Sequence, residues 1–208
     1  MTSRLLVIAK EPVAGRVKTR LCPPFSPEEA ASLAEESLRD TIGVARCAGV
    51  PIAVALEGRR PDWLDVPVFA QRGIGLADRL ANAFVDGGCP ALLIGMDSPQ
   101  ITTEDIDAAM TELSCPSTDA VLGPAADGGY WCIGLKRSDP EAFRGIPMSV
   151  PQTLAKQRER LRTRGLKVAE VHELRDVDTY DDARAVAALA PKTRFARLFA
   201  TLTAPISP

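Results

Sequence analysis

The sequence predicts an α/β fold, in which a single domain forms a three-layer α/β/α sandwich with helices on both faces of a mostly parallel sheet. The chain has 208 residues, enough for one domain with a sizeable core. Apolar residues make up 46% and charged residues 25%, which excludes a largely disordered chain. Short apolar segments alternate with helical segments of about ten or more residues, as parallel strands require. We therefore treat residues 1–208 as one domain, with residues 191–208 as a C-terminal helix and tail.

Seven apolar segments are expected to form the strands of this sheet. A short apolar run bounded by turn signals is typical of a buried strand. Residues 4–9 fit this description, and residues 91–95 (ALLIG) are the clearest central strand. The remaining strands are expected at residues 52–56, 66–70, 120–123, 131–135 and 167–172.

Capping residues and apolar periodicity predict the helices between these strands. Ser26 is expected to cap a helix that ends at Gly49, because Pro27 suits the first helical position and Glu29 completes a capping box. Apolar side chains at helical spacing predict a last helix at residues 192–202, packed on the domain; a homodimer contact is the alternative, so a monomer and a homodimer both stay open. Further helices are expected at residues 76–85, 103–113 with Thr103 as its cap, 150–164 and 180–189.

Charge and composition exclude several classes of partner. The formal net charge is −2, so no overall basic field exists that would attract nucleic acid or an anionic membrane. The apolar runs are too short to span a bilayer or to form the core of a signal peptide, and we expect a cytoplasmic protein. Five cysteines without a C-x-x-C pair indicate reduced thiols rather than a disulfide framework or a zinc site. The single histidine, His172, is expected to be a strand residue that points to solvent.

The loop after the first strand carries a concentration of positive charge. Ligands of open α/β sheets bind at the carboxyl ends of strands, so this loop is expected to face a ligand. Its cationic side chains are Lys10, Arg16, Lys18 and Arg20, and Gly15 lets backbone amides approach an anion closely. The pattern predicts binding of a polyphosphate, and the alternative is a solvated charged loop. The segment differs from a Walker loop, because the glycines that precede the lysine in that motif are missing.

Acidic residues follow other strands. Asp97, directly after the central strand, is placed to hold a divalent cation, since magnesium typically takes one or two carboxylates together with substrate phosphates. Asp178, after the last predicted strand, can supply a second carboxylate. The alternatives are structural: a turn cap at Asp97 and helix capping around Asp178. The segment after the fifth strand is either a turn or backbone that lies against a flat ligand group; it comprises Asp127, Gly128, Gly129 and Tyr130.

Four separated segments resemble one family. They are AKEPVAGRVKTRL (residues 9–21), IGMDSP (94–99), GPAADGGYWCIGL (123–135) and DVDT (176–179). In these segments the chain is similar to the rSAM/selenodomain-associated transferases, which have the nucleotide-diphospho-sugar transferase, or GT-A, fold. More distantly, it resembles 2-phospholactate guanylyltransferase and molybdenum-cofactor guanylyltransferase.

The resemblance implies roles for individual residues. Asp97 would be the principal metal ligand, and Asp178 matches a late aspartate that completes the metal site in related enzymes. The loop at residues 127–130 would lie near the acceptor. The chain departs from the family at residues 147–150, which lack an aromatic residue, and this departure concerns acceptor recognition. Residues implied to bind the nucleotide or line its site are Ala9, Lys10, Gly15, Arg16, Lys18, Arg20, Gln71, Arg79 and Asn82.

Three functions remain open at this point. The first is a metal-dependent nucleotidyltransferase, in which an acceptor attacks the α-phosphorus of a nucleoside triphosphate, with Mg²⁺ (or Mn²⁺) as cofactor and a small molecule as acceptor. Lys18, Asp97 and Asp178 would be its catalytic residues, and an anionic acceptor would need no general base. The second is a glycosyltransferase that uses a nucleotide sugar. The third is a nucleotide-binding module without turnover.

Overall fold

The computed structural model describes residues 3–204, and its core is one seven-stranded sheet. The strands are β1 (Arg4–Lys10), β2 (Ile52–Glu57), β3 (Val68–Ala70), β4 (Ala91–Gly95), β5 (Ala120–Pro124), β6 (Tyr130–Leu135) and β7 (Val168–Glu170). Their order in the sheet is β3-β2-β1-β4-β6-β5-β7. Strand β6 runs antiparallel to its neighbours β4 and β5, and the other neighbouring strands are parallel. The predicted α/β class and mostly parallel sheet are confirmed.

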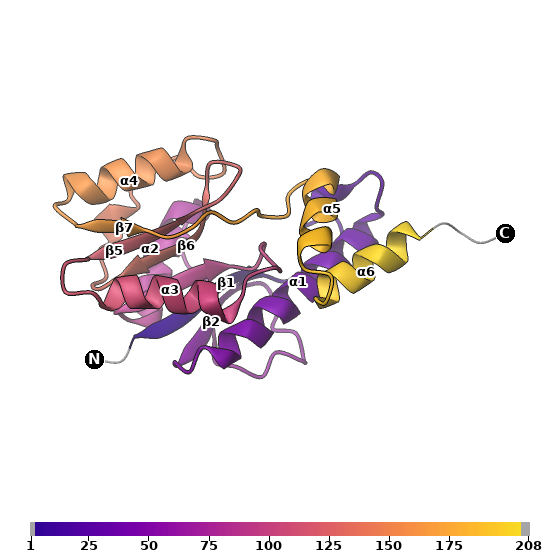
Figure 1. Cartoon of the computed structure of the whole chain (residues 1–208), viewed down its shortest axis with the longest axis horizontal. Coiled ribbons are helices and arrows are strands. Elements are labelled where there is room, and N and C mark those ends of the chain that lie inside the picture. The colour runs from indigo at the N-terminus through magenta and orange to yellow at the C-terminus, as the bar shows by residue number, and fades with distance from the viewer. Residues whose placement is uncertain (1–2, 205–208) are drawn as a thin grey trace.

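Helices cover both faces of this sheet (Figure 1). They are α1 (Pro27–Cys47), α2 (Gly75–Gly87), α3 (Thr103–Ser114), α4 (Thr153–Thr163), α5 (Tyr180–Leu189) and α6 (Arg194–Thr203), with short 3-10 helices η1 (Thr19–Leu21) and η2 (Pro140–Ala142). Successive strand residues point to opposite faces, so Val7 of β1 packs with α1 and α3, whereas Leu6 packs with α2 and α4. The three-layer sandwich is thus confirmed. No helix within residues 3–204 combines the length and apolar character needed to cross a membrane.

Two helix starts show how local side chains set the boundaries. The capping box at Ser26 is confirmed: its side chain accepts a hydrogen bond from the Glu29 N–H (3.1 Å), and the Glu29 carboxylate accepts one from the Ser26 N–H (2.8 Å). At α3 the predicted cap is wrong. Thr102 rather than Thr103 is the cap, because it exchanges the same pair of bonds with Asp105 (3.2 and 2.8 Å).

Other predicted boundaries differ near the carboxyl edge of the sheet. Helix α4 begins at Thr153 rather than at residue 150, because the Thr153 hydroxyl lies 2.9 and 2.7 Å from the carbonyls of Pro147 and Val150 and stabilises a turn there. Strand β7 ends at Glu170, so the predicted strand position of His172 is wrong, whereas its predicted exposure to solvent is confirmed. Its side chain is half-exposed, and its Nε2 lies 3.0 Å from the Asp105 carboxylate in the first turn of α3.

Helices α5 and α6 pack beside α1, to one side of the sandwich (Figure 1). Phe195 and Phe199 of α6 are buried in this contact, and the first two backbone N–H groups of α6 donate to the Asp40 carboxylate of α1 (3.0 and 2.9 Å). The expected packing of the last helix on the domain is confirmed. The same cluster buries Leu21 of η1 and Val177, so it anchors both the cationic loop and the late acidic segment.

Candidate active site

Two clefts meet at the carboxyl ends of β1 and β4. The first has a volume of about 310 Å³ and the second about 430 Å³. Both are lined by Lys10, Met96, Asp97 and Ser149. Asp97 therefore lies at their junction, at the edge of the sheet where ligands of open α/β proteins bind.

The second cleft is positively charged. All four loop cations line it, namely Lys10, Arg16, Lys18 and Arg20, and its acidic residues are Asp97 and Asp178. Gly15 has a φ of +73°, which glycine adopts without a steric penalty, so it supports the turn of the loop. The loop thus gathers its cations in one concave surface, as a polyphosphate site requires.

Lys18 links the cationic loop to the sheet. Its backbone lies in the left-handed region with a φ of 48°, which is uncommon for a residue other than glycine. Its side chain is only 9% exposed, and its Nζ lies 2.5 Å from a carboxylate oxygen of Asp97. The same Nζ donates to the carbonyl of Val177, whose N–H donates to the carbonyl of Asp97 (2.8 Å). One nearly buried cation therefore joins three segments that are far apart in sequence.

Asp178 lies at the exposed rim of the second cleft, in an ion pair with Arg20. Helix α5 is capped by Thr179 and Asp182 rather than by Asp178. The Thr179 side chain accepts a hydrogen bond from the Asp182 N–H, and the Asp182 carboxylate accepts one from the Thr179 N–H (2.9 Å). Helix capping in this segment is thus confirmed, but it involves Thr179 and Asp182, whereas the Asp178 carboxylate pairs with Arg20. The metal role of Asp178 stays a prediction.

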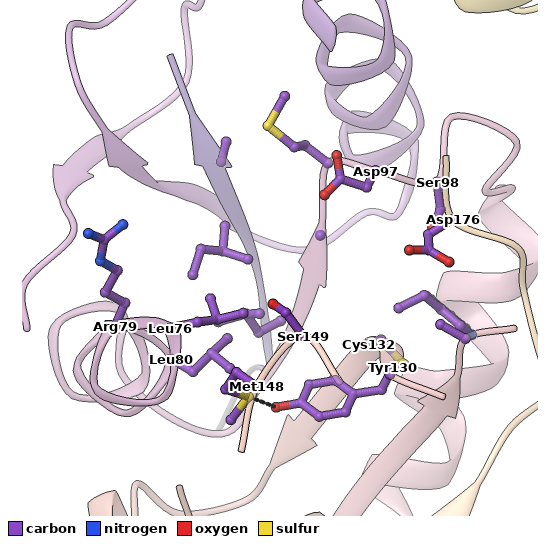
Figure 2. Close-up of a pocket in the computed structure, with 18 of the residues that line it drawn as sticks. Leu76, Arg79, Leu80, Asp97, Ser98, Tyr130, Cys132, Met148, Ser149 and Asp176 are labelled. Carbon is purple, nitrogen blue, oxygen red and sulfur yellow. Dashed lines mark hydrogen bonds between the residues drawn. The ribbon is translucent and has the colours of Figure 1, made fainter. Parts of the chain in front are cut away.

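Asp176 is a functional candidate that the sequence analysis did not select. It lines the first cleft together with Asp97 (Figure 2), and the N–H of the next residue, Val177, donates to the Asp97 carbonyl (2.8 Å). The pKa of this carboxyl is raised to about 6, chiefly by burial and then by the charge of Asp127, while the charge of Lys18 opposes the shift. A signal was available in the sequence, because acids at alternate positions of an extended segment fall on one side, here opposite the buried Val177.

The turn predicted after β5 is confirmed and borders the first cleft. Gly128 has a φ of +88°, and a Cβ atom there would lie 2.2 Å from the Pro151 carbonyl oxygen. The Asp127 carboxylate accepts from the Gly129 N–H (2.7 Å). Asp127, Gly129 and the half-buried Tyr130 line the cleft, and burial of the Tyr130 hydroxyl raises its pKa. A tight turn thus places one carboxylate at the cleft.

Three further residues that are implied to bind nucleotide also border the first cleft. Ala9, Gln71 and Arg79 line it, and the Gln71 Nε2 donates to the Ala9 carbonyl (2.7 Å). Asn82, which is also implied to bind nucleotide, is not among the residues that line either cleft. Its side-chain amide donates to the Arg72 carbonyl (2.9 Å) and supports the turn that precedes α2.

The second cleft offers carboxylates to a metal ion, but the protein does not supply a complete set of ligands. No group of three or more His, Cys, Asp or Glu side chains within residues 3–204 lies close enough to hold one. Asp97 and Asp178 nevertheless share the second cleft, and oxygen ligands suit Mg²⁺, which usually keeps phosphate and water ligands as well. The residues therefore fit a cation that a polyphosphate substrate brings with it.

A family described as "uncharacterized protein conserved in bacteria" (DUF2064) matches residues 41–150, more than half of the chain. The chain belongs to the DUF2064 family. The matched region contains Asp97 and Asp127, whereas the cationic loop and the segment from Asp176 to Asp178 lie outside it.

Individual relatives extend this assignment. The 2-phospho-L-lactate guanylyltransferase of Haloarcula marismortui is 29% identical over 179 residues, covering 82% of this chain and 80% of the relative. A candidate nucleotide-diphospho-sugar transferase from Desulfovibrio desulfuricans G20 superposes with a TM-score of 0.83 at 28% identity, over 97% of this chain and 94% of that one. CMP:2-keto-3-deoxy-manno-octonic acid synthetase complexed with CTP shares the fold, with a TM-score of 0.59 at 16% identity over 92% and 99% of the chains.

These matches confirm three predictions: the fold, the resemblance to a 2-phospholactate guanylyltransferase and the transferase class. The resemblance to rSAM/selenodomain-associated transferases stays a prediction.

Proposed function

We propose that this DUF2064 protein is a metal-dependent nucleotidyltransferase that transfers a nucleoside monophosphate from a nucleoside triphosphate to a small-molecule acceptor. The observation that carries the proposal is the position of Asp97 at the junction of the two clefts. The second cleft is cationic and suits a polyphosphate, and the first has a size typical for small ligands. Similarity to a guanylyltransferase over 82% of the chain supports the same activity. The proposal keeps the cytoplasmic location, and it includes neither a nucleic-acid nor a membrane partner.

The cationic cleft would hold the triphosphate. Lys10, Arg16 and Lys18 neutralise the outer phosphates and the charge that develops on the leaving pyrophosphate. An α-phosphate bound beside Asp97 then faces the first cleft, where the acceptor lies. An acceptor oxygen attacks the α-phosphorus, the bond from phosphorus to the bridging oxygen breaks, and pyrophosphate leaves.

Asp97 and Asp178 would hold Mg²⁺ (or Mn²⁺) together with phosphate oxygens of the substrate. Such a cation, when bound, neutralises phosphate charge and fixes the geometry of an in-line displacement. Lys18, which contacts Asp97 in this structure, is close enough to exchange that carboxylate for a phosphate oxygen.

A glycosyltransferase is the second candidate, supported by the TM-score of 0.83 with a candidate nucleotide-diphospho-sugar transferase. The same cations and acids would then hold a nucleotide sugar, and a nucleoside diphosphate would leave. The four cations of the second cleft favour the triphosphate, because it carries more negative charge than a diphospho-sugar.

A ligand panel with product analysis tests the proposal. Nucleoside triphosphates and nucleotide sugars are compared by thermal shift with and without Mg²⁺ or Mn²⁺, since a bound ligand raises the apparent melting temperature. We expect the largest shift with one triphosphate plus metal, pyrophosphate as product, and loss of both in Asp97→Asn. Asp107→Asn removes an exposed acid of α3 and is the matched control. Nucleoside diphosphate as product would establish the second candidate, and metal-independent binding without turnover would establish a binding module.

A further inference from the structure

One of the residues that line both clefts does not belong to the strand ends. Lys10, Met96 and Asp97 lie at the carboxyl ends of β1 and β4. Ser149 lines the same two clefts, but it lies in the segment between η2 and α4. Figure 2 shows Ser149 and Asp97 on separate segments that both border the first cleft. A group bound where the clefts meet is therefore bordered by Ser149 as well as by the strand ends.

The backbone of Ser149 has a conformation that is uncommon for serine. Its φ is 59°, in the left-handed region, where the Cβ atom of any residue except glycine is crowded. Lys18 is the other non-glycine residue with a positive φ in the described part of the chain, and it also lines the second cleft. Such conformations persist where the surrounding structure holds them, and they are frequent at ligand sites. Both unusual backbone positions therefore border the same cleft.

Neighbouring residues hold the turn that contains Ser149. The hydroxyl of Thr153, a residue only 4% exposed, lies 2.7 Å from the Val150 carbonyl oxygen and accepts a hydrogen bond from the Val150 N–H (3.2 Å). Gly128 packs so closely against Pro151 that a Cβ atom on it would lie 2.2 Å from the Pro151 carbonyl oxygen. None of these contacts uses the Ser149 hydroxyl, and Ser149 is exposed. The turn thus fixes the position of a hydroxyl that can bind a ligand.

A hydroxyl suits the group that the proposed function puts where the clefts meet. There the α-phosphate lies beside Asp97 and faces the first cleft. A serine hydroxyl donates one hydrogen bond, and a bond to an ionised acceptor such as phosphate is stronger than one between neutral groups. The hydroxyl carries no charge, so it is compatible with the Lys18 ammonium and with a cation on Asp97.

We propose that the Ser149 hydroxyl donates a hydrogen bond to a non-bridging oxygen of the α-phosphate, the phosphate that is transferred in the proposed reaction. The inference rests on the proposed function. Lys10, Arg16 and Lys18 hold the outer phosphates in the second cleft, whereas Ser149 holds the α-phosphate from the turn before α4. Its role is to bind and orient the substrate, and no bond or proton is exchanged at it.

Calorimetry with the full chain tests this contact. GTP, ATP, CTP and UTP are titrated in the presence of Mg²⁺, and the triphosphate that binds most tightly is carried forward. Ser149→Ala should weaken its binding by roughly 10-fold or more, because a hydrogen bond to a charged group is lost. Binding of inorganic pyrophosphate, which contains no α-phosphate, should be unchanged. Ser138→Ala removes an exposed serine outside both clefts and is the matched control.

Two outcomes of this titration overturn the inference. Unchanged triphosphate affinity in Ser149→Ala means that the hydroxyl does not touch the nucleotide, as when it binds only the acceptor. Equal weakening of triphosphate and pyrophosphate means that Ser149 supports the cationic cleft as a whole.

Sulfur substitution identifies the phosphate that Ser149 contacts. Replacing one non-bridging α-oxygen of the same triphosphate by sulfur gives two isomers, and sulfur is a weak acceptor of hydrogen bonds. If the hydroxyl binds one of these oxygens, the ratio of the two Kd values should differ between wild type and Ser149→Ala by roughly 5-fold or more, because the contact couples the two changes. An identical ratio in both proteins overturns the inference.

A glycine variant excludes an effect of misfolding. Ser149→Gly also removes the hydroxyl, but glycine adopts a positive φ without a steric penalty. It should therefore melt at or above the wild-type temperature and still lose as much triphosphate affinity as Ser149→Ala. Wild-type affinity in Ser149→Gly overturns the inference, since the hydroxyl would then be dispensable.

The proposed function fails in a different way. If none of the four triphosphates binds in the presence of Mg²⁺, the nucleotidyltransferase proposal falls and this inference falls with it. If a triphosphate binds with Mg²⁺, depends on Asp97, and binds equally well to both Ser149 variants, the proposed function stands and only the role of Ser149 is wrong.

Discussion

Replacing Asp176 by Asn should stabilise the metal-free protein at neutral pH. Burial raises the pKa of this carboxyl from its ordinary value of 3.8 to about 6, so its ionised form is less favourable in the folded chain than in the unfolded one. Stability is therefore lost as the pH rises from about 4 to about 6, and the loss is complete above that range. The pKa difference corresponds to about 3 kcal/mol. Because Asp176 is only partly buried, solvent screening reduces this to roughly 1–2 kcal/mol.

The assay is thermal and urea denaturation of wild type and Asp176→Asn, both treated with chelator, at pH 4.5 and 7.5. For a chain of this size, 1–2 kcal/mol corresponds to a melting temperature about 2–8 °C higher in the variant at pH 7.5. At pH 4.5 the two proteins should differ little, because the wild-type carboxyl is then mostly protonated in the folded state. A variant that melts below wild type at pH 7.5 would refute the reasoning, since it would show that the carboxylate makes a stabilising contact.

Three further predictions concern the neighbouring charges. Asp97→Asn should lose Mg²⁺-dependent nucleotide binding while keeping its fold, and an unchanged metal titration by calorimetry would contradict the metal assignment. Lys18→Ala should weaken binding of the triphosphate far more than of the monophosphate, and equal weakening of both would reduce Lys18 to a link between the loop and the sheet. Asp178→Asn should change the metal-free stability by less than about 1 kcal/mol, because its ion pair with Arg20 is exposed, yet it should reduce Mg²⁺ affinity; a clear drop in melting temperature with an undiminished ligand shift argues for a structural role.

The elements of the fold were predictable because their signals are local. A capping box needs only residues three positions apart, and Ser26 with Glu29 satisfies it both in sequence and in space. A run such as residues 91–95 is apolar throughout because β4 is buried on both faces of the sheet. One error was local, because Thr102 and Thr103 are adjacent candidates for the same cap. Another arose where a contact with a distant segment decides the local structure. His172 leaves the strand pattern because it packs against the first turn of α3 and meets Asp105.

The site was predictable in part for the same reason. Asp97 and the cations of the loop follow strands, and parallel strands bring their carboxyl ends to one edge, so the sequence alone indicated that these groups would meet. Asn82 could not be placed by a pattern, since its hydrogen bond to Arg72 depends on how the turn before α2 folds.

The sequence by itself determined the layered fold, the cationic loop and the acid at the end of the central strand. Only the tertiary structure decided which charges pair and which stay uncompensated. Lys18 pairs with Asp97 and Arg20 with Asp178, whereas Asp176 is left unpaired in the first cleft. The reason is that local propensities and apolar periodicity act over a few residues. The pairing and burial of a charge depend instead on packing between distant segments, here the cluster that buries Leu21 and Val177 against α1.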